Sequence, residues 1–193
     1  PFPFNWDGIP RRFMNPGELE ILITLVASVK PRGVLEFGVN EGRTAKAILD
    51  SVPGIKLYQG VDVLPGYVTA KPVQRKEVPA DPGWRAEHEF AFQLLVRPRG
   101  SFDLKAEDLE PCDAVFIDGD HGREGVLNDT ALARELVRPG GIVIWHDYHS
   151  LLGQDGKPTV DVPAVLDEMH AAGAPISHVE NTWLAFERVP DGR

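Results

Sequence analysis

Short apolar runs that end in turns alternate with segments of helical spacing along most of this chain. Seven runs have the length and composition of strands: 34–37, 57–63, 90–96, 114–117, 142–145, 176–179 and 183–188. Four segments repeat apolar residues every three or four positions, as amphipathic helices do: 16–29, 43–49, 125–136 and 162–171. Such an alternation predicts a mostly parallel sheet that is covered by helices on both faces.

The order of these segments predicts a Rossmann-like, doubly wound α/β fold with a seven-stranded sheet. A tight turn at 180–182 joins the last two runs, so the C-terminal hairpin adds an antiparallel strand to a sheet that is otherwise parallel. A chain of 193 residues, 42% of them hydrophobic, suits one domain, and we expect residues 1–193 to form it.

Two segments fit neither the strand pattern nor the helix pattern. Residues 1–14 are rich in proline and aromatic residues. We expect them to form an N-terminal arm that lies on the domain or joins it to a second copy in a homo-oligomer. Residues 64–88 are rich in proline, and we expect a lid-like insert where a regular fold would place a helix.

Charge and composition exclude several classes of partner. The formal net charge of −9 argues against a nucleic-acid duplex, whose phosphates require a basic surface. No apolar run approaches the roughly 20 residues of a membrane span, and no signal-peptide pattern opens the sequence. The single cysteine, Cys112, excludes an intramolecular disulfide, and we expect a soluble, cytoplasmic protein.

The first motif follows the first predicted strand and reads Glu36-Phe37-Gly38-Val39-Asn40-Glu41-Gly42-Arg43-Thr44. Glycines in such a turn let the backbone bend sharply and approach a ligand, and the following helix directs its free amide groups at the same place. Asp62 ends the second predicted strand, where an acidic side chain can accept hydrogen bonds from ribose hydroxyls. We expect a nucleoside site between Glu36 and Asp62, with a purely structural turn as the alternative for the glycines.

The glycine spacing distinguishes between nucleoside cofactors. Dinucleotide sites usually show G-x-G-x-x-G, whereas three residues separate Gly38 from Gly42 in this chain. The pattern E-x-G-x-x-x-G-x-T resembles motif I of the class I S-adenosylmethionine-dependent methyltransferases, which implies S-adenosylmethionine as the cofactor. We expect it to be bound by Glu36, Gly38, Asn40, Gly42, Thr44, Asp62, Val63, Ser101 and Asp118.

The second motif spans a strand–helix–strand unit. Its parts are Phe116-Ile117-Asp118-Gly119-Asp120-His121, Arg138-Pro139-Gly140-Gly141 and Trp145-His146-Asp147. The combination resembles the macrocin O-methyltransferases and the cephalosporin hydroxylase-like group, cousins of the catechol O-methyltransferases. The resemblance covers roughly 15–188 and weakens over 64–99. It implies methyl transfer to a hydroxyl oxygen of a small molecule.

Acidic residues at the ends of the fourth and fifth strands suggest a metal site. Neighbouring strands lie about 4.8 Å apart, so Asp118 and Asp147 can both reach one small cation. Oxygen ligands suit a divalent cation such as Mg²⁺ or Mn²⁺. The resemblance implies a third ligand just before Asp147; that residue is His146 here rather than an acid, which shifts the preference toward softer metals.

His121 follows Asp118 by three residues and would reach the same crevice. An imidazole, with an ordinary pKa of about 6.5, is suited to accept a proton from a hydroxyl at neutral pH. The resemblance implies the same role, so we expect His121 and Asp118 to be catalytic. Structural roles stay open: Asp118 as a helix cap or a ligand of the cofactor's amino group, and both histidines as loop residues.

Two other functions also stay open at this point. A chain of this fold whose metal site has decayed would bind S-adenosylmethionine without catalysis. A nucleotide-dependent oxidoreductase would bind NAD(H) instead. A hydroxylase has less support, because the sequence shows no firm set of two histidines and one carboxylate for iron.

Overall fold

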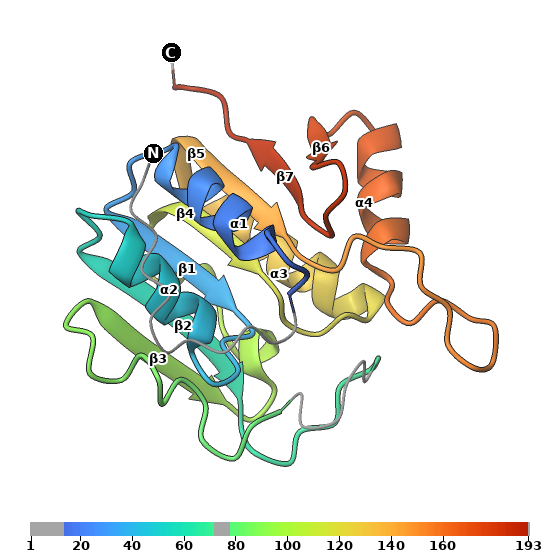
Figure 1. The fold of residues 1–193 in the computed structure, drawn as a ribbon, viewed down its shortest axis with the longest axis horizontal. Coiled ribbons are helices and arrows are strands. Elements are labelled where there is room, and N and C mark those ends of the chain that lie inside the picture. Colours follow the sequence, from blue (N-terminus) through green and yellow to red (C-terminus); the bar gives the residue numbers. More distant parts are fainter. Residues whose placement is uncertain (1–13, 72–77, 193) are drawn as a thin grey trace.

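The computed structural model describes residues 14–71 and 78–192 (Figure 1). Its strands are β1 (Gly33–Phe37), β2 (Leu57–Val63), β3 (Phe92–Arg97), β4 (Cys112–Ile117), β5 (Val137–Trp145), β6 (Ile176–His178) and β7 (Ala185–Arg188). Its helices are α1 (Glu18–Ala27), α2 (Arg43–Ser51), α3 (Arg123–Leu136) and α4 (Val162–Ala171), with short 3-10 helices at Gly100–Asp103 and Ala106–Asp108.

All seven strands belong to one sheet, in the order β3-β2-β1-β4-β5-β7-β6. The first five in this order pair in parallel. β7 is antiparallel to both of its neighbours, β5 and β6. The predicted Rossmann-like α/β fold with an antiparallel C-terminal strand is therefore confirmed. The strand order changes direction between β1 and β4, which is where ligands bind in open α/β sheets.

Helices cover both faces of the sheet (Figure 1). α1 and α2 pack on one face, together with residues such as Ile144 of β5. α3 and α4 pack on the other face, which receives residues such as Val143. Because successive residues of a strand point to opposite faces, a strand covered on both sides is apolar at nearly every position. All five residues of β1 are buried and only Glu36 among them is charged, so the apolar residues of the strand do not alternate with polar ones.

Most element boundaries differ from the predicted ones by a few residues, and the differences at β5, β3 and α1 are the most informative. β5 begins at Val137 and so includes the Arg-Pro-Gly-Gly segment, because Val137 pairs with Cys112 before a shift in register. β3 begins at Phe92 and leaves the side chain of Phe90 fully exposed. α1 begins at Glu18, after a left-handed turn at Gly17 with φ of 89°.

The described parts of the insert after β2, 64–71 and 78–88, contain neither helix nor strand, as predicted. The first part lies across the loop between β4 and α3. There the Ala70 amide donates to the Asp120 carboxylate at 3.1 Å, and Lys71 forms an ion pair with Asp161 at 3.1 Å. The N-terminal arm expected at 1–14, apart from Met14, and residues 72–77 lie outside the described residues.

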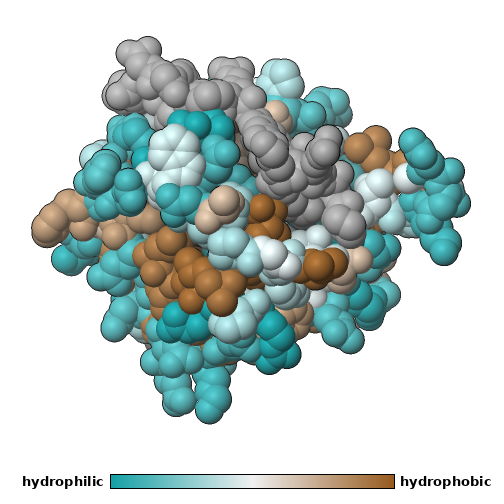
Figure 2. Space-filling view, turned by 90° about the horizontal axis from the view of Figure 1, so that it is seen from below, coloured by the Kyte–Doolittle hydropathy of each residue, from teal (hydrophilic) through white to brown (hydrophobic). Residues whose placement is uncertain are grey.

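The surface of the molecule near β3 and the insert is not uniformly polar. Figure 2 shows a compact group of hydrophobic side chains in the middle of this surface, surrounded by hydrophilic ones. Large hydrophobic side chains are exposed in the insert and just after it, at Leu64, Val68, Trp84 and Phe90. No helix within the described ranges is long and apolar enough to cross a membrane.

Candidate active site

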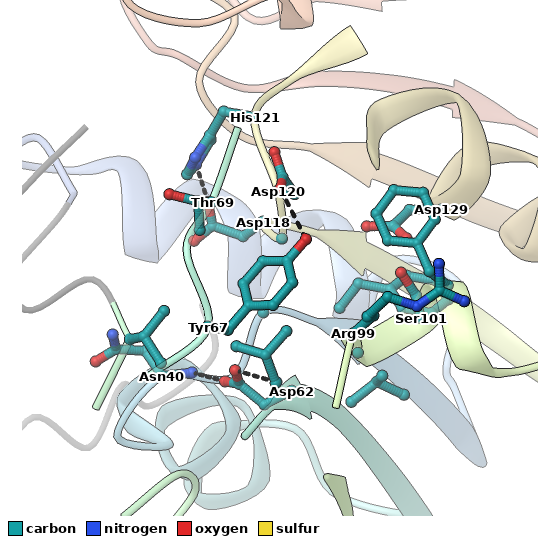
Figure 3. A pocket seen from close by; sticks show the side chains of 18 of the residues that line it. Asn40, Asp62, Tyr67, Thr69, Arg99, Ser101, Asp118, Asp120, His121 and Asp129 are labelled. Carbon is teal, nitrogen blue, oxygen red and sulfur yellow. Dashed lines mark hydrogen bonds and ion pairs between the residues drawn. The ribbon is translucent and has the colours of Figure 1, made fainter. Parts of the chain in front are cut away.

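A pocket opens at the carboxyl ends of the parallel strands, beside the switch between β1 and β4 (Figure 3). The turn after β1, the end of β2 and the 99–102 turn after β3 form one part of its wall. The loop 118–121 after β4 and residues 146–147 after β5 form another part. The insert contributes Tyr67, Thr69 and Val78. Five strand ends and the insert thus enclose a single space.

The turn after β1 needs glycine because two chain segments approach closely. A Cβ atom on Gly38 would lie 2.0 Å from the carbonyl oxygen of Asp118, and the φ angle of Gly38 is +84°. A Cβ on Gly42, also at +84°, would lie 2.9 Å from the carbonyl oxygen of Gly83 in the insert. Contacts within the chain therefore give both glycines a structural reason, and the approach to a ligand inferred from the sequence stays a prediction.

Asp62 lines this pocket and is 8% exposed. Its two carboxylate oxygens accept hydrogen bonds from the backbone amides of Asn40, at 2.6 Å, and Val63, at 2.7 Å. Burial raises the pKa of Asp62 to about 6, although the backbone hydrogen bonds partly oppose this. The group is thus ionised at neutral pH, with lone pairs left to accept bonds from a ligand.

The pocket brings together most of the predicted cofactor residues. Gly38, Asn40, Asp62, Val63, Ser101 and Asp118 all line it. Glu36, Gly42 and Thr44 are not among its lining residues. The carboxyl group of Glu36 is buried in the sheet, accepts a hydrogen bond from the Tyr58 hydroxyl at 2.9 Å, and has a pKa raised by burial.

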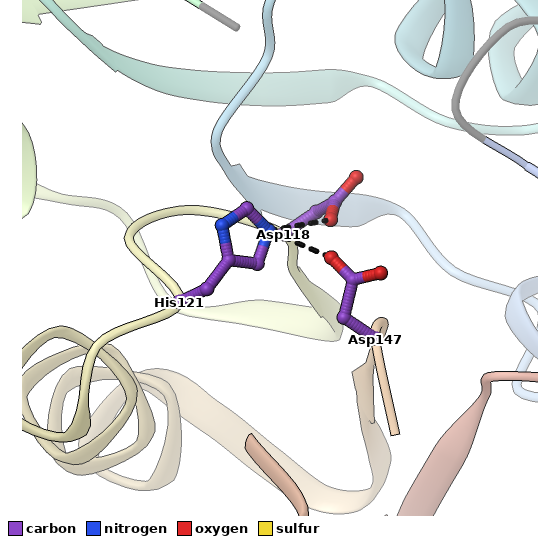
Figure 4. A group of neighbouring side chains, drawn as sticks. All are labelled: Asp118, His121 and Asp147. Carbon is purple, nitrogen blue, oxygen red and sulfur yellow. Dashed lines mark ion pairs between the residues drawn. The ribbon is translucent and has the colours of Figure 1, made fainter. Parts of the chain in front are cut away.

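Carboxylates and an imidazole meet at the other end of the pocket (Figure 4). The Nε2 atom of His121 lies 2.7 Å from Oδ2 of Asp147 and 3.8 Å from Oδ1 of Asp118. One ligand atom from each of these three residues lies within 4.8 Å of the others, close enough to hold a metal ion. The two carboxylates predicted as neighbours are therefore adjacent, and Asp147 follows β5 with a left-handed φ of 58°.

His146 is buried between this group and α1. Its Nδ1 atom lies 3.3 Å from Oδ1 of Asp118 and 3.4 Å from Oδ1 of Asp147, while its Nε2 lies 3.4 Å from Oε2 of Glu18. Burial alone would lower the pKa of His146, but the three carboxylates outweigh it and raise that pKa well above its ordinary value. Burial would raise the pKa of Asp147, and hydrogen bonds from His121, His146 and His149 lower it instead.

A comparison with protein families gives these features a common context. Residues 35–148, from β1 to just beyond β5, match the family model described as a methyltransferase domain. The chain belongs to this methyltransferase family. The match includes Asp62, Asp118, His121 and Asp147, and so contains the strand ends that form the pocket.

Solved structures of similar fold cover nearly the whole methyltransferase chain. Cofactor-bound Rv0187 from MTB is 20% identical with a TM-score of 0.65, over 96% of this chain and 85% of that one. The O-methyltransferase from Bacillus cereus in complex with SAH is 18% identical with a TM-score of 0.57, over 94% and 84%. TomG from Streptomyces achromogenes, in complex with SAM, is 15% identical with a TM-score of 0.58, over 96% and 83%. No curated protein matches the chain.

Several residues in or next to the pocket of this methyltransferase escaped the sequence-based prediction. Glu18 and His149 contact the buried cluster from distant parts of the chain, and no local pattern marks them. Asp120 was part of the quoted motif, but its role in holding the insert depends on a contact with residue 70. Asp129 accepts a hydrogen bond from Asn128 at 3.3 Å and also lines the pocket, although no motif identified it as a site residue.

Proposed function

We propose that this methyltransferase transfers the methyl group of S-adenosylmethionine to a hydroxyl oxygen of a small molecule. The observation that carries the proposal is one pocket with two chemically distinct ends. Asp62 offers carboxylate oxygens at one end, and Asp118, His121 and Asp147 meet at the other. A nucleoside with an attached sulfonium fits such a pocket, with the acceptor hydroxyl held at the carboxylate–imidazole end.

The residues near β1 and β2 fit the cofactor. Backbone amides hold both carboxylate oxygens of the buried Asp62 in a fixed orientation. A carboxylate fixed in this way is suited to accept hydrogen bonds from the two hydroxyls of a ribose. Asp118 follows β4 and is one-fifth exposed, so its carboxylate is available to a cationic group of the ligand. When bound, S-adenosylmethionine supplies the reactive methyl group on its sulfonium, and the protein supplies position and electrostatics.

The donor set at the opposite end also fits a divalent cation. Asp118 and Asp147 would hold it, and His146 and His121 each place one nitrogen within 4 Å of both carboxylates. Two carboxylates with an imidazole suit Mn²⁺ and other transition metals as well as Mg²⁺. When bound, the cation would act as a Lewis acid on the acceptor hydroxyl.

We assign the acceptance of the hydroxyl proton to the imidazole of His121. Its Nε2–H would stay hydrogen-bonded to the Asp147 carboxylate, so the proton would be taken up at Nδ1. The adjacent Asp147 carboxylate, 2.7 Å away, would stabilise the imidazolium that forms. The insert, with Tyr67 and Thr69 in the pocket wall, would exclude water from the reacting groups. Holding the reacting atoms in line supplies on the order of 7–11 kcal/mol in well-oriented systems.

Isothermal titration calorimetry tests the cofactor assignment. Wild-type protein treated with EDTA should bind S-adenosylmethionine and show no heat with NAD(H). Binding of NAD(H) alone would favour an oxidoreductase. Binding of S-adenosylmethionine without transfer to any hydroxyl compound in a broad panel would favour a non-catalytic binding protein.

A second titration, with MnCl₂, separates the roles of the two histidines. His146→Ala should weaken Mn²⁺ binding, whereas His121→Ala should retain it and lose roughly 10²–10⁴-fold in methyl-transfer rate. A loss of Mn²⁺ binding in His121→Ala would make His121 a metal ligand instead of the base, as the proximity of its nitrogen to both carboxylates also permits.

A further inference from the structure

Glu18, the first residue of α1, is a buried carboxylate that lies behind the carboxylate–imidazole group. Its side chain is 1% exposed. α1 begins beside the end of β5, so this carboxylate approaches the site from the helix-covered face of the sheet (Figure 1). His146 lines the pocket and Glu18 is not among its lining residues. Glu18 therefore contacts the site through His146 and not through the pocket.

The groups that reach the Glu18 carboxylate are hydrogen-bond donors. The Asn15 backbone amide donates to Oε2 at 2.7 Å, and the Asn15 side-chain amide donates to Oε1 at 2.9 Å. The amide of Trp183, in the turn between β6 and β7, also donates to Oε1. The remaining neighbour is Nε2 of His146, 3.4 Å from Oε2. Because a carboxylate can only accept, the nitrogen that faces it carries the hydrogen.

A hydrogen on Nε2 of His146 determines what the other ring nitrogen can do. Nδ1 lies 3.3 Å from Oδ1 of Asp118 and 3.4 Å from Oδ1 of Asp147. An imidazole binds a metal through a lone pair on one nitrogen, and the hydrogen bond of the other nitrogen determines which one is used. With the hydrogen on Nε2, the lone pair of the neutral ring is on the side of the two aspartates.

The surroundings of His146 restrict the orientation of its ring. The ring is buried, packs edge-on against Phe116 with centroids 6.2 Å apart, and lies 6.1 Å from the ring of Trp183. Turning the ring over would place carbon atoms where the two nitrogens now face carboxylates. The buried Glu18 would then lose one of its donors, which is unfavourable away from water. Glu18 therefore favours the orientation that directs Nδ1 at the two aspartates.

A carboxylate in the place of His146 would need no such partner, because an ionised carboxylate has no hydrogen to orient. An imidazole has two nitrogens, and only one of them faces the two aspartates. The buried carboxylate behind His146 thus meets a requirement that arises from the histidine itself.

We propose that Glu18 is a positioning residue, which holds the hydrogen of His146 on Nε2 so that Nδ1 is presented to a divalent cation at Asp118 and Asp147. The inference rests on the proposed function, in which these two aspartates hold the cation. Carboxylate partners of metal-binding histidines typically contribute about 10–100-fold to metal affinity. Glu18 acts on the cation through His146, so its contribution should depend on the presence of that ring.

The test is a double-mutant cycle in which MnCl₂ is titrated calorimetrically into wild type, Glu18→Gln, His146→Ala and the double variant. Glu18→Gln should weaken Mn²⁺ binding by about 10–100-fold, because a neutral amide holds the Nε2 hydrogen less strongly. The same change in the His146→Ala background should weaken it by less than about 3-fold. The readout is metal affinity and does not require methyl transfer.

A matched control separates this role from a general effect of losing a buried carboxylate. Asp113 also accepts hydrogen bonds from two backbone amides, but it lies at the opposite end of β4. Asp113→Asn should leave Mn²⁺ affinity unchanged. Urea unfolding of each variant measures the loss of stability that comes from the contacts of Glu18 with Asn15 and Trp183.

A second measurement needs only wild type if Glu18→Gln does not fold. Nitrogen-15 spectra of histidine-labelled protein with bound Zn²⁺ distinguish ring nitrogens with and without hydrogen, and His146→Ala identifies the signals of His146. The hydrogen should be on Nε2. A hydrogen on Nδ1 with Zn²⁺ bound would overturn the proposal.

Two outcomes of the titrations have different meanings. An equal loss of Mn²⁺ affinity from Glu18→Gln in both backgrounds, with wild type binding the metal, would leave Glu18 with only a structural role. Failure of wild type to bind Mn²⁺ would reject the cation of the proposed function and with it the role of Glu18.

Discussion

At the scale of single residues, the same carboxylate chemistry is used at both ends of the sheet, but with different surroundings. Asp62 and Asp113 each accept hydrogen bonds from two backbone amides at 2.6–2.9 Å. Asp62 lines the pocket at the carboxyl ends of the strands, whereas Asp113 lies near the amino end of β4. Comparing variants of Asp62 and Asp113 therefore distinguishes the effect of such a carboxylate on stability from its effect on ligand binding.

Asp62→Asn should weaken S-adenosylmethionine binding by about 1.5–3 kcal/mol, or roughly 10–100-fold, because charge-assisted hydrogen bonds to the ribose are lost. Asp113→Asn should cost similar stability in urea unfolding and leave binding unchanged. Calorimetric titration of both variants checks this. If Asp62→Asn binds S-adenosylmethionine with wild-type affinity, the ribose does not bind at Asp62.

Gly38 and Gly54 allow a second comparison, since both have left-handed φ angles, +84° and +95°. Gly54→Ala should cost only the backbone strain, about 1 kcal/mol, because nothing lies within 4 Å of its Cβ position. Gly38→Ala should cost several times more or prevent folding, because its Cβ would overlap the Asp118 carbonyl. Equal urea midpoints for the two variants would contradict the close approach of the strand ends.

Asp129 gives a pH-dependent prediction. Burial raises its folded pKa to about 7, above the usual 3.8, so the folded state binds the proton more tightly than the unfolded state. The stability associated with that proton is complete below about pH 4 and is lost as the pH rises through 7. Asp129→Asn should therefore be more stable than wild type at pH 8, by up to about 4 kcal/mol, with no advantage near pH 4. Urea unfolding across this range measures the difference, and a constant difference would exclude the raised pKa.

At the scale of elements, the insert is attached to the loop after β4 through one side chain. Asp120 accepts hydrogen bonds from the amides of Ala70, at 3.1 Å, and Gly122, at 2.9 Å. We propose that 64–88 acts as a lid, and its attachment to Asp120 supports a closed arrangement over the pocket.

Hydrogen exchange checks the lid. Amides in 64–71 should exchange faster in Asp120→Ala than in wild type, and should become protected when cofactor and acceptor bind. Asp155→Ala, which removes a carboxylate from the loop after β5, serves as the control and should leave these amides unchanged. Full protection in the wild type without ligand would argue against gating.

The sequence predicted the strands that a local apolar run marks. It did not predict strand boundaries that depend on pairing with a neighbouring strand. The apolar runs of β1, β2 and β4 predicted their strands because both faces are covered. The segment from Arg138 to Gly141 has the composition of a turn, yet it is part of β5, because Val137 before it and Ile142 after it both pair with β4, with a shift in register between them. The start of β3 is similar: its pairing with β2 begins at Phe92, two residues after the first alternating aromatic residue.

At the scale of the whole molecule, the position of the site followed from topology. Asp62, Asp118 and Asp147 were predicted as functional because each lies at or just after the carboxyl end of a parallel strand, and these ends meet at one edge of the sheet. Contacts between segments that are distant in the sequence could not be predicted from topology. Glu18 of α1 reaches His146 across 128 residues, and no periodicity in the chain specifies that approach.

In the proposed function, methyl transfer in this pocket depends on a divalent cation held by Asp118 and Asp147. The most direct test of this dependence is transfer of labelled methyl from S-adenosylmethionine to a panel of phenols, catechols and sugars, with EDTA and then with added Mg²⁺ or Mn²⁺. We predict that EDTA abolishes transfer while cofactor binding survives, that either metal restores it, and that Asp147→Asn behaves like the chelated enzyme. Full transfer in EDTA, with Asp147→Asn unimpaired, would exclude a divalent cation from the reaction.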